Sequence, residues 1–366
     1  MATYYVAPNG IGNASSWANA GDLANTLALI LASPSPGGDE IWALGDNNVW
    51  GVSGIYSITN TLNMNVPDVR LYGGFRGTET NLQQRNAYIA CNVPAFPNYF
   101  PFPSVLRGIT GLNQSIINVA ADDCVIDGFL IENGGGSAVM MGGGLYAGRG
   151  LSNLLFENLV FKNNYADDGG GMFLGDCDGV IKNSFFFQND ASMGGGLHLN
   201  DCFHADKIRL FNVLFADNGA TTVEGGAIFI DHSMVEIINC TFADNHASSI
   251  NNSNGIFLDG GSPTDIYNSI FYQDWIHPVI GAGVVPNINF CLLNQPFGGG
   301  IGNMFSPPPP PFVGGGNYHL QTAVSLCINA GSNAFVPPPV ATATDLEGRP
   351  RILNGVVDMG AFEHLI

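Results

Sequence analysis

Asn158-Leu-Val-Phe161-Lys-Asn-Asn164-Tyr-Ala166 is the stretch that decides the fold, because its pattern N-x-x-F-x-x-N-x-A returns along the chain. Successive copies are 25 to 31 residues apart, and self-similarity at a near-constant period is the signature of a repeat architecture. Further copies begin at Asn183, Asn212 and Asn239, a weaker one at Asn268, and a degenerate earlier one is Asp127…Leu130…Asn133.

A glycine cluster and a short apolar strand follow each copy of this motif. The runs are short, alternate apolar with other residues, and are broken by Gly, Asn and Asp, which predicts strands and excludes a helical solenoid. Short strands at this period predict a parallel β-helix in which each coil is one repeat. The clusters are Gly142-Gly-Gly-Leu-Tyr146, Gly169-Gly-Gly-Met-Phe-Leu174, Gly194-Gly-Gly-Leu-His-Leu199, Gly225-Gly-Ala-Ile-Phe-Ile230 and Gly255-Ile-Phe-Leu258.

Stacked coils would place equivalent residues about 4.8 Å apart, the spacing of paired strands. We therefore expect the motif phenylalanines to form an internal stack and the second motif asparagines to form a ladder at a tight turn. There the backbone would take the left-handed conformation that Asn tolerates. The stack comprises Phe161, Phe186, Phe215, Phe242 and Phe271, and the ladder comprises Asn164, Asn189, Asn218 and Asn245.

The two ends of the chain depart from the repeat. Residues 22–32 carry apolar residues at helical spacing, which predicts an amphipathic helix that caps the open end of the core before a first strand at 41–44. The prediction is an N-terminal cap over 1–45, β-helix coils over 46–285 with the clearest repeats over 127–275, and an irregular Pro-rich C-terminal region and cap over 286–366.

Charge narrows the choice of partners. The 366 residues include 30 Asp and Glu against 11 Lys and Arg, a formal net charge of −19, which argues against nucleic acid and anionic membranes as partners. Cations or neutral glycans remain compatible with this charge. The sequence holds no apolar run long enough to be a transmembrane segment, and its first residues do not resemble a signal peptide.

The pairing of F-x-x-N with G-G-A-[ILV] resembles the repeats of the polymorphic outer-membrane-protein family, which are right-handed parallel β-helices. The first motif occurs at Phe161–Asn164 and in the next three copies, and the second is complete at Gly225-Gly-Ala-Ile228. The flanks over 71–79, 345–351 and 358–363 look like the ends of exported bacterial β-helix proteins. The resemblance implies an all-β chain with a single right-handed, pectate-lyase-like parallel β-helix, located extracellularly or at the cell surface.

One side chain in each strand after a glycine cluster should point outward, because its two apolar neighbours point into the core. An exposed aromatic row often marks a binding face, here for a glycan or a surface protein. The alternative is that the row is covered, for example by the Pro-rich arm near Phe305–Phe312. The row comprises Tyr146, Phe173, His198, Phe229 and Phe257.

A row of acids follows these strands. Stacked carboxylates repel one another unless a cation or a shared proton lies between them, and Ca²⁺ prefers oxygen ligands of this kind. The alternative is a solvated acidic edge, and we predict no cofactor beyond this candidate Ca²⁺ site. The acids are Asp176, Asp201, Asp231 and Asp259.

No constellation in the sequence stands out as catalytic, although Lys207 and Arg209 follow Asp201 closely. We expect a non-catalytic exported protein that binds a glycan or a partner protein along an outer face. The alternatives are a polysaccharide lyase or glycoside hydrolase acting in a surface groove, and a structural subunit that self-associates head to tail or laterally. Cys177 and Cys202 lie one repeat apart and should be neighbours on adjacent coils, as free thiols or within disulfide range.

Overall fold

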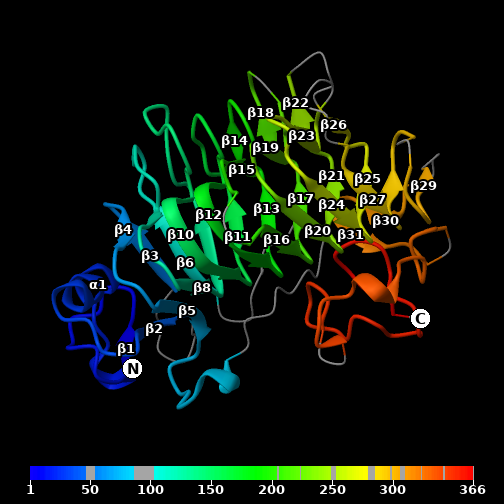
Figure 1. Cartoon of the computed structure of the whole chain (residues 1–366). Helices are drawn as coiled ribbons and strands as arrows, with labels where there is room; N and C mark the ends of the chain where they lie inside the picture. The colour runs from blue at the N-terminus through cyan, green and yellow to red at the C-terminus, as the bar shows by residue number, and fades with distance from the viewer. Residues whose placement is uncertain are drawn as a thin grey trace.

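The computed structural model describes residues 1–46, 54–85, 103–203, 206–222, 224–248, 253–278, 285–296, 299–305, 310–322, 324–340 and 343–365. The chain forms a parallel β-solenoid, which confirms the predicted all-β class. Its coils follow one another from the blue N-terminal end to the orange C-terminal end, and the two chain termini lie at opposite ends of the stack (Figure 1).

Each central coil, from the one that begins with β4 to the one that ends with β28, contributes a first, a second and a third strand, and equivalent strands of successive coils pair in parallel. First and second strands belong to one 16-stranded sheet. The first strands are β4 (Leu62–Met64), β7 (Ile117–Val119), the start of β10 (Leu145–Glu157), the start of β12 (Met172–Lys182), β15 (Leu197–Asn200), β19 (Ile228–Asp231), β23 (Ile256–Leu258) and β26 (Ile276–Pro278). The second strands are β1 (Ala2–Val6), β2 (Asp39–Leu44), β5 (Val69–Phe75), β8 (Val125–Asp127), the ends of β10 and β12, β16 (Ile208–Phe211), β20 (Val235–Ile238), β24 (Thr264–Tyr267) and β27 (Asn287–Asn289).

Third strands form a separate 10-stranded sheet on the other side of the core. They are β3 (Ile55–Ile58), β6 (Ser104–Gly108), β9 (Phe129–Glu132), β11 (Val160–Lys162), β13 (Phe185–Phe187), β17 (Leu214–Ala216), β21 (Thr241–Ala243), β25 (Ile270–Tyr272), β28 (Leu292–Leu293) and β29 (Met304–Phe305). The remaining elements are a small sheet of β14 (Asp190–Ala191), β18 (Gly219–Ala220) and β22 (His246–Ala247), the antiparallel pair β30 (Phe312–Gly314) and β31 (Asn317–Leu320), and the 3-10 turns η1 (Trp17–Asn19), η2 (Leu82–Gln84) and η3 (Asn333–Phe335).

The N-terminal end of the core is covered by α1 (Leu23–Ala32), which confirms the helix predicted over 22–32. The Asp22 carboxylate accepts a hydrogen bond from the backbone N–H of Asn25 and so caps the helix. Ile30 on the apolar face is fully buried in the main core. No helix among the described residues has the length and apolar character to cross a bilayer.

The motif phenylalanines stack inside the solenoid, as their spacing predicts. Phe186 pairs in register with Phe161 on one side and Phe215 on the other, and neighbouring ring centroids along the stack are 4.4 to 5.1 Å apart. The third glycine of a cluster lies against this stack. A Cβ on Gly171 would come within 2.9 Å of Phe186 Cδ1 and 2.5 Å of the Gly196 carbonyl oxygen, so a larger residue would collide with ring and backbone.

The second motif asparagines form the expected ladder, and all are buried. The Asn164 amide donates to Asn189 Oδ1 at 3.0 Å, Asn189 donates to Asn218 Oδ1 at 3.0 Å, and Asn218 donates to Asn245 Oδ1 at 2.9 Å. Asn245 in turn donates to the carboxylate of Asp274. Every rung therefore links one coil to the next through a buried hydrogen bond.

The backbone conformation expected at this ladder lies one residue earlier. The residues before the four ladder asparagines and before Asp274 have φ between 53° and 62°, so the prediction was wrong in its position within the turn. The first asparagine of each motif also adopts the left-handed conformation, with φ between 49° and 54°. The residues of the first group are Asn163, Gln188, Asp217, Asp244 and Gln273, and those of the second are Asn158, Asn183, Asn212, Asn239 and Asn268.

The degenerate early copy lies one residue later than the sequence analysis placed it. Ile131 pairs with Phe161, whereas Leu130 pairs with Val160 and packs on the outer side of the sheet. Gly128, with φ of 85°, takes the left-handed position that the first motif asparagine occupies elsewhere. The sequence pattern was ambiguous here, because the adjacent apolar residues Leu130 and Ile131 both fit the phenylalanine position of the motif.

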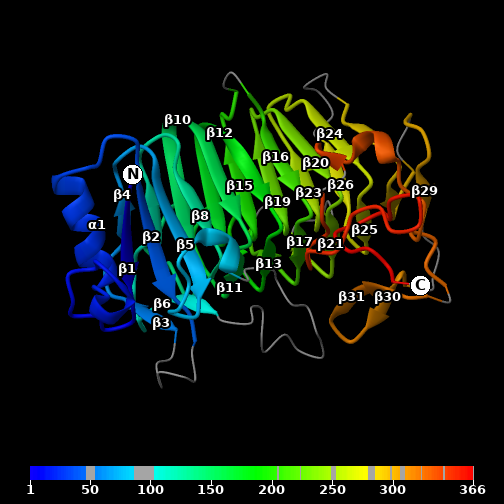
Figure 2. The same cartoon turned by 90° about the horizontal axis from the view of Figure 1, so that it is seen from below.

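The coils continue beyond residue 285, so the predicted boundary between coils and C-terminal region is too early. β27, β28 and β29 add further strands to both large sheets. Later residues turn back along the outer face of the 10-stranded sheet, beside β17, β21 and β25 (Figure 2). Phe312, Tyr318 and Phe362 are buried there in one cluster with Leu214 and Ile270.

The first motif asparagines fasten this C-terminal segment to the coils. In three of the five motif copies, the side-chain amide of this asparagine donates to a backbone carbonyl oxygen of the segment. The bonds run from Asn212 to Thr344 at 2.6 Å, from Asn239 to Asp358 at 3.1 Å and from Asn268 to Ser332 at 3.0 Å.

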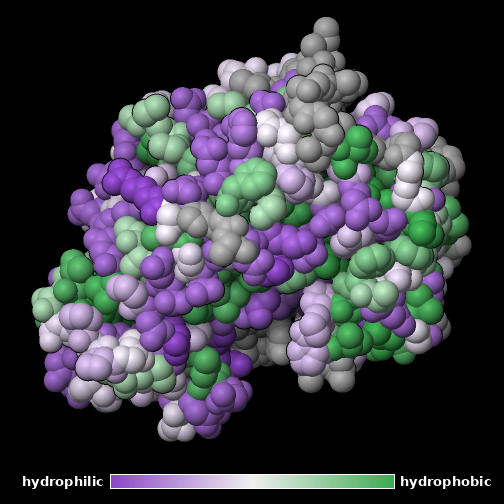
Figure 3. All heavy atoms as spheres, viewed as in Figure 1, coloured by the Kyte–Doolittle hydropathy of each residue, from purple (hydrophilic) through white to green (hydrophobic). Residues whose placement is uncertain are grey.

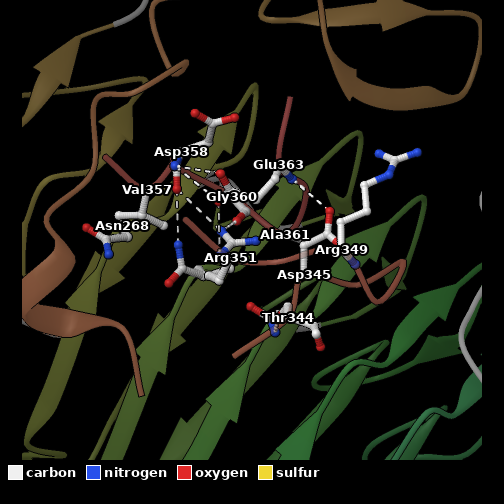
Figure 4. Close-up of polar contacts among 12 residues, drawn as sticks. Asn268, Thr344, Asp345, Arg349, Arg351, Val357, Asp358, Gly360, Ala361 and Glu363 are labelled. Carbon is white, nitrogen blue, oxygen red and sulfur yellow. Dashed lines mark hydrogen bonds and ion pairs between the residues drawn. The ribbon is translucent and has the colours of Figure 1, made fainter. Parts of the chain in front are cut away.

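A buried charged cluster holds the segment together internally (Figure 4). Arg351 is almost fully buried, donates to the carbonyl oxygens of Asp358 and Gly360, and lies 3.3 Å from Glu363 Oε1. Asp345 accepts a hydrogen bond from the backbone N–H of Glu363 at 2.9 Å. The sequence flanks over 345–351 and 358–363 therefore have a structural role in this protein.

Candidate functional site

One side chain from each first strand points away from the interior. Strand register aligns Tyr146 with Phe173, Phe173 with His198, His198 with Phe229 and Phe229 with Phe257. None of these belongs to the main interior cluster, which holds their strand neighbours on either side. The same register adds members at both ends. We call the full set the outer row: Asn63, Asn118, Tyr146, Phe173, His198, Phe229, Phe257 and His277.

Four members of the outer row are buried, so the expectation of an exposed aromatic face is wrong for them. Phe173, His198, Phe229 and Phe257 are 3% to 8% exposed. Their rings cover one another, with neighbouring centroids 4.9 to 5.0 Å apart. A ligand cannot reach these four side chains, and Tyr146, which is half-buried, is the predicted binding residue that stays accessible.

The Pro-rich arm does not supply this cover where the structure describes it. Phe312 packs edge-on against Tyr272 and Tyr318, on the outer face of the 10-stranded sheet. The cluster that holds Phe312 contains no member of the outer row. Phe305 is largely exposed, and residues 306–309 lie outside the described part of the chain.

His198 stands between Phe173 and Phe229 with no hydrogen-bond partner for either ring nitrogen. The nearest acid is Asp168, whose Oδ1 is 3.8 Å from His198 Nδ1. Burial lowers the pKa of His198 to about 4, and burial together with the Asp167 carboxylate raises the pKa of Asp168 to about 6. The imidazole is therefore neutral at pH 7 and behaves as one more ring in the stack.

The N-terminal end of the outer row is open and polar. Asn118 Nδ2 donates to Asn63 Oδ1 at 2.9 Å, and the Tyr146 ring stacks on Phe173 with centroids 5.7 Å apart. A cleft of about 650 Å³ lies over Asn63, Asn118 and Tyr146. None of the described residues that line it carries a charge. We call it the amide cleft, and its other lining residues are Asn60, Thr61, Asn113, Gln114, Ser115, Ala138 and Val139.

The connections that lead into β4 and β7 are shorter than those that lead into the next five first strands. Only residues 59–61 join β3 to β4, and 109–116 join β6 to β7. Residues 133–144 join β9 to β10, the next four connections span 9 to 12 residues, and residues 273–275 join β25 to β26. A longer connection can lie beside the row, as the contact between Asp168 and His198 shows, whereas three residues only close the turn.

Hydrogen bonds hold the cleft's polar groups in place. The backbone N–H of Thr61 donates to Gln114 Oε1 at 3.2 Å, and the Thr61 hydroxyl donates to the Ser115 carbonyl oxygen at 2.8 Å. Asn63 Nδ2 donates to the Thr61 carbonyl oxygen at 3.1 Å. Gln114 Nε2 and Asn118 Oδ1 take part in none of these bonds, so a donor and an acceptor remain for a bound molecule.

The four predicted metal-site acids do not assemble into one site. Asp231 lies 2.6 Å from His232 Nδ1, and Asp259 accepts a hydrogen bond from the neighbouring Gly260 N–H. Asp176, within β12, and Asp201, just after β15, are both exposed and have φ of 51° and 54°. Within the described ranges, no three His, Cys, Asp or Glu side chains come together as a metal site. This arrangement gives the predicted Ca²⁺ site no geometric support.

A charged cluster lies on the outer face of the second strands. Lys207 Nζ is 3.0 Å from Glu236 and 3.2 Å from Asp265, and Arg209 pairs with Asp206 at 2.7 Å. Desolvation lowers the pKa of Lys207, but its bonds to Glu236 and Asp265 outweigh this and leave the pKa above its ordinary value. A general base needs a lowered pKa, so these cations are poor candidates for proton abstraction.

A second cleft, of about 480 Å³, lies between the coils and the C-terminal segment. Its floor includes Phe211 and the ion pair between Lys182 Nζ and Glu157 Oε2, which are 3.1 Å apart. Residues 337–339 form its opposite wall. Burial, followed by the nearby Asp127 charge, raises the pKa of Glu157, and Lys182 opposes the shift.

Cys177 and Cys202 are buried free thiols close enough to interact, as their spacing of one repeat predicts. The Cys202 thiol donates to the Leu174 carbonyl oxygen at 3.4 Å. The turn they occupy continues through hydroxyl residues, because Ser233 Oγ accepts from the Cys202 N–H and Ser262 Oγ accepts from the Ser233 N–H. Successive coils therefore carry a small side chain at this position that hydrogen-bonds to the backbone. We assign the two cysteines a structural role.

Comparison with known proteins finds no matching family model and no matching curated protein. The resemblance to the polymorphic outer-membrane-protein family is therefore not confirmed. Among solved structures, the chain is similar to the crystal structure of pectate lyase Pel9A, with 15% identity and a TM-score of 0.42, over 100% of this chain and 97% of that chain. The similarity is one of fold.

Sequence reasoning missed most of the amide cleft, because its residues precede the clear repeats. Asn63 and Asn118 carry neither the F-x-x-N motif nor a glycine cluster before them. The signal that could have found them is the alternation in Leu62–Met64 and Ile117–Val119, where a central Asn lies between two buried apolar residues. The same alternation directs Tyr146 outward, because its neighbours Leu145 and Ala147 are in the core.

Proposed function

We propose that this chain is a non-catalytic glycan-binding β-solenoid that acts extracellularly or at the cell surface, and that the amide cleft is its binding site. The observation that carries the proposal is an open cleft lined by amides, hydroxyls and Tyr146, without a charged described residue, in a chain of net charge −19. An acidic protein that keeps charge out of one cleft provides a suitable environment for an uncharged ligand.

The cleft's chemistry suits a sugar. Sugar hydroxyls both donate and accept hydrogen bonds, and side-chain amides offer both functions. Gln114 Nε2 and Asn118 Oδ1 would serve as donor and acceptor, and they are held by the bonds that Thr61 and Asn63 make. The apolar C–H face of a sugar ring would pack on Tyr146. A few placed polar groups around one aromatic surface are typical of small-ligand sites.

The test is binding to an array of neutral oligosaccharides, followed by calorimetry on the glycan bound best. We expect Tyr146→Ala and Asn118→Ala to weaken binding at least tenfold, because each removes a direct contact. Phe203→Ala is the matched control, since Phe203 is an exposed aromatic residue outside the described lining of the clefts. Binding that survives both cleft substitutions would reject the site, and an array without any bound glycan would reject the function.

Polysaccharide cleavage is a second candidate, supported by the cleft over Glu157. A carboxyl group with a raised pKa beside Lys182 is the kind of residue that acts as a general acid. Incubation with neutral and acidic polysaccharides should then release reducing ends or unsaturated products, and Glu157→Gln should abolish the release. An intact polymer after prolonged incubation would reject this candidate.

A further inference from the structure

We infer that the binding surface extends beyond the amide cleft into a neighbouring cleft beside Tyr165, and that the two together are built for a neutral oligosaccharide of several units. This inference rests on the proposed function, because it names the class and length of the glycan that the same site would take. It is carried by the geometry of the wall between the clefts and by the distribution of charge around them.

The neighbouring cleft has a volume of about 290 Å³ and an aromatic side chain at its edge. Tyr165 is 39% exposed, a large fraction for an aromatic residue. The described lining otherwise consists of Ile109, Thr110, Leu112 and a few Gly and Asn residues. Like the amide cleft, this one combines an accessible tyrosine with polar groups and has no charged residue in its described lining. We call it the Tyr165 cleft.

A thin partition separates the two clefts. Gln114 lines the amide cleft, Gly135 lines the Tyr165 cleft, and the Gly135 N–H donates to the Gln114 carbonyl oxygen at 2.9 Å. Bridged backbone segments lie about 5 Å apart, so the clefts adjoin across the width of one such pair. A molecule longer than a single sugar would pass from one cleft to the other over this partition.

Tyr165 is fixed to the partition through its backbone. Its N–H donates to the Gly134 carbonyl oxygen at 3.0 Å, and its carbonyl oxygen accepts from the Gly136 N–H at 3.1 Å. A Cβ on Gly135 would come within 1.7 Å of the Tyr165 carbonyl oxygen, so glycine is needed for this close approach. The second tyrosine is thus held on a rigid wall, as a stacking residue should be.

Acidic residues flank the uncharged region on both sides. Tyr165 pairs with Asp190 in the next coil, and Asp190 Oδ1 lies 3.9 Å from His246 Nε2. Next to the amide cleft, the Asp167 N–H donates to the Val139 carbonyl oxygen, which places two consecutive acids, Asp167 and Asp168, beside it. A carboxylated or sulfated chain that filled both clefts would meet like charges, so the arrangement favours a neutral chain.

The experiment compares short, long and charged chains on the intact protein. The probes are cellobiose and cellohexaose, mannobiose and mannohexaose, xylobiose and xylohexaose, and cellohexaose oxidised to carboxylate at C6, each titrated by calorimetry. For the backbone that binds, we expect the hexaose to bind about tenfold or more tightly than the disaccharide, because it gains a second aromatic contact. The oxidised cellohexaose should bind more weakly than any neutral hexaose that binds.

Two variants isolate the second cleft. Tyr165→Ala should remove most of the advantage of the hexaose and leave the disaccharide affinity unchanged, whereas Tyr165→Phe should keep the hexaose affinity because it keeps the ring. Equal binding of disaccharide and hexaose, or an unaltered hexaose affinity in Tyr165→Ala, would overturn the extension but not the amide cleft. Equal or tighter binding of the oxidised chain would overturn the neutral class. A protein that binds none of the probes contradicts both this inference and the proposed function.

Discussion

The outer row has two regions whose side chains differ in solvent exposure, although both regions lie on equivalent strands. At its N-terminal end, Asn63, Asn118 and Tyr146 lie under an open cleft. Further along, Phe173 and Phe229 occupy the same strand position and are buried. The direction of a side chain is thus set by strand alternation, whereas its exposure depends on which groups of the neighbouring coils pack against it.

The surface of the molecule shows the same contrast on a larger scale. Hydrophilic residues dominate the central coils in Figure 3, and hydrophobic residues gather over the C-terminal segment at the right of the view. That segment is where the outer face of the 10-stranded sheet is covered by a separate stretch of chain. In this solenoid, each outward-facing apolar surface described above is covered either by its own ring stack or by a later segment.

The largest effect should come from breaking the buried part of the row. Phe229→Ala should lower the free energy of unfolding by about 3–5 kcal/mol, because it leaves a cavity between His198 and Phe257. Urea-induced unfolding measures this directly. A loss of less than about 1 kcal/mol, typical of exposed positions, would show that the ring is accessible after all.

His198 gives the next largest effect, through pH. The unfolded chain protonates this imidazole near its ordinary pKa of 6.5 and the folded chain near 4, so the unfolded state binds more protons between those values. Stability should therefore fall by about 2–3 kcal/mol as pH drops from 6.5 to 4. The raised pKa of Asp168 acts in the opposite direction over part of this range, and its half-exposed position weakens that contribution.

His198→Phe separates the two contributions. The variant should gain about 1–2 kcal/mol at pH 7, because two buried nitrogens without partners are replaced by an apolar ring in the same stack. It should also lose the part of the acid sensitivity that His198 causes. Denaturant melts at pH 7, 5.5 and 4.5 test this, and a variant with an unchanged or steeper pH dependence would show that His198 is not buried neutral.

Tyr146 should behave differently from its buried neighbours. Tyr146→Ala should cost only about 0.5–1.5 kcal/mol of stability, the worth of one stacked aromatic pair, while binding falls at least tenfold. The pairing of a small loss in stability with a large loss in binding is the signature of an accessible site residue. A stability loss as large as that of Phe229→Ala would place Tyr146 in the buried region.

The smallest effect is expected at the acid row. Asp201→Asn changes an exposed turn residue and should shift the free energy of unfolding by about 0.5 kcal/mol or less. Because the structure does not gather these acids, millimolar Ca²⁺ should leave the melting temperature of both proteins unchanged. A rise in melting temperature that Asp201→Asn removes would restore the metal site.

Local and periodic features of this fold were predictable from sequence. Phe186 and Asn189 recur at the same offset in each copy, and stacking alone then places them in the ring stack and the amide ladder. The capping helix was predictable for the same reason, since its apolar spacing is visible in one short segment. Position in a repeat is information that a single sequence carries directly.

The candidate site depended on information that a repeat pattern does not carry. Strand alternation directs the Phe229 side chain outward, but its burial depends on the rings of His198 and Phe257 in the adjacent coils. Asn118 belongs to a coil without the motif, so no periodic signal singled it out. The destination of the C-terminal segment was equally hidden, because Phe312 reaches its partners across a large sequence distance.

The attachment of the C-terminal segment has a consequence for how the chain folds and unfolds. A solenoid repeat normally contacts only its two neighbours, so end coils can fray singly. Here the hydrogen bonds of Asn212, Asn239 and Asn268 join residues 132, 119 and 64 positions apart in sequence. The surface that receives the segment exists only after several coils have formed, which makes its attachment a late step in folding. Once attached, it links coils that do not touch one another, so the C-terminal half should unfold as one cooperative unit.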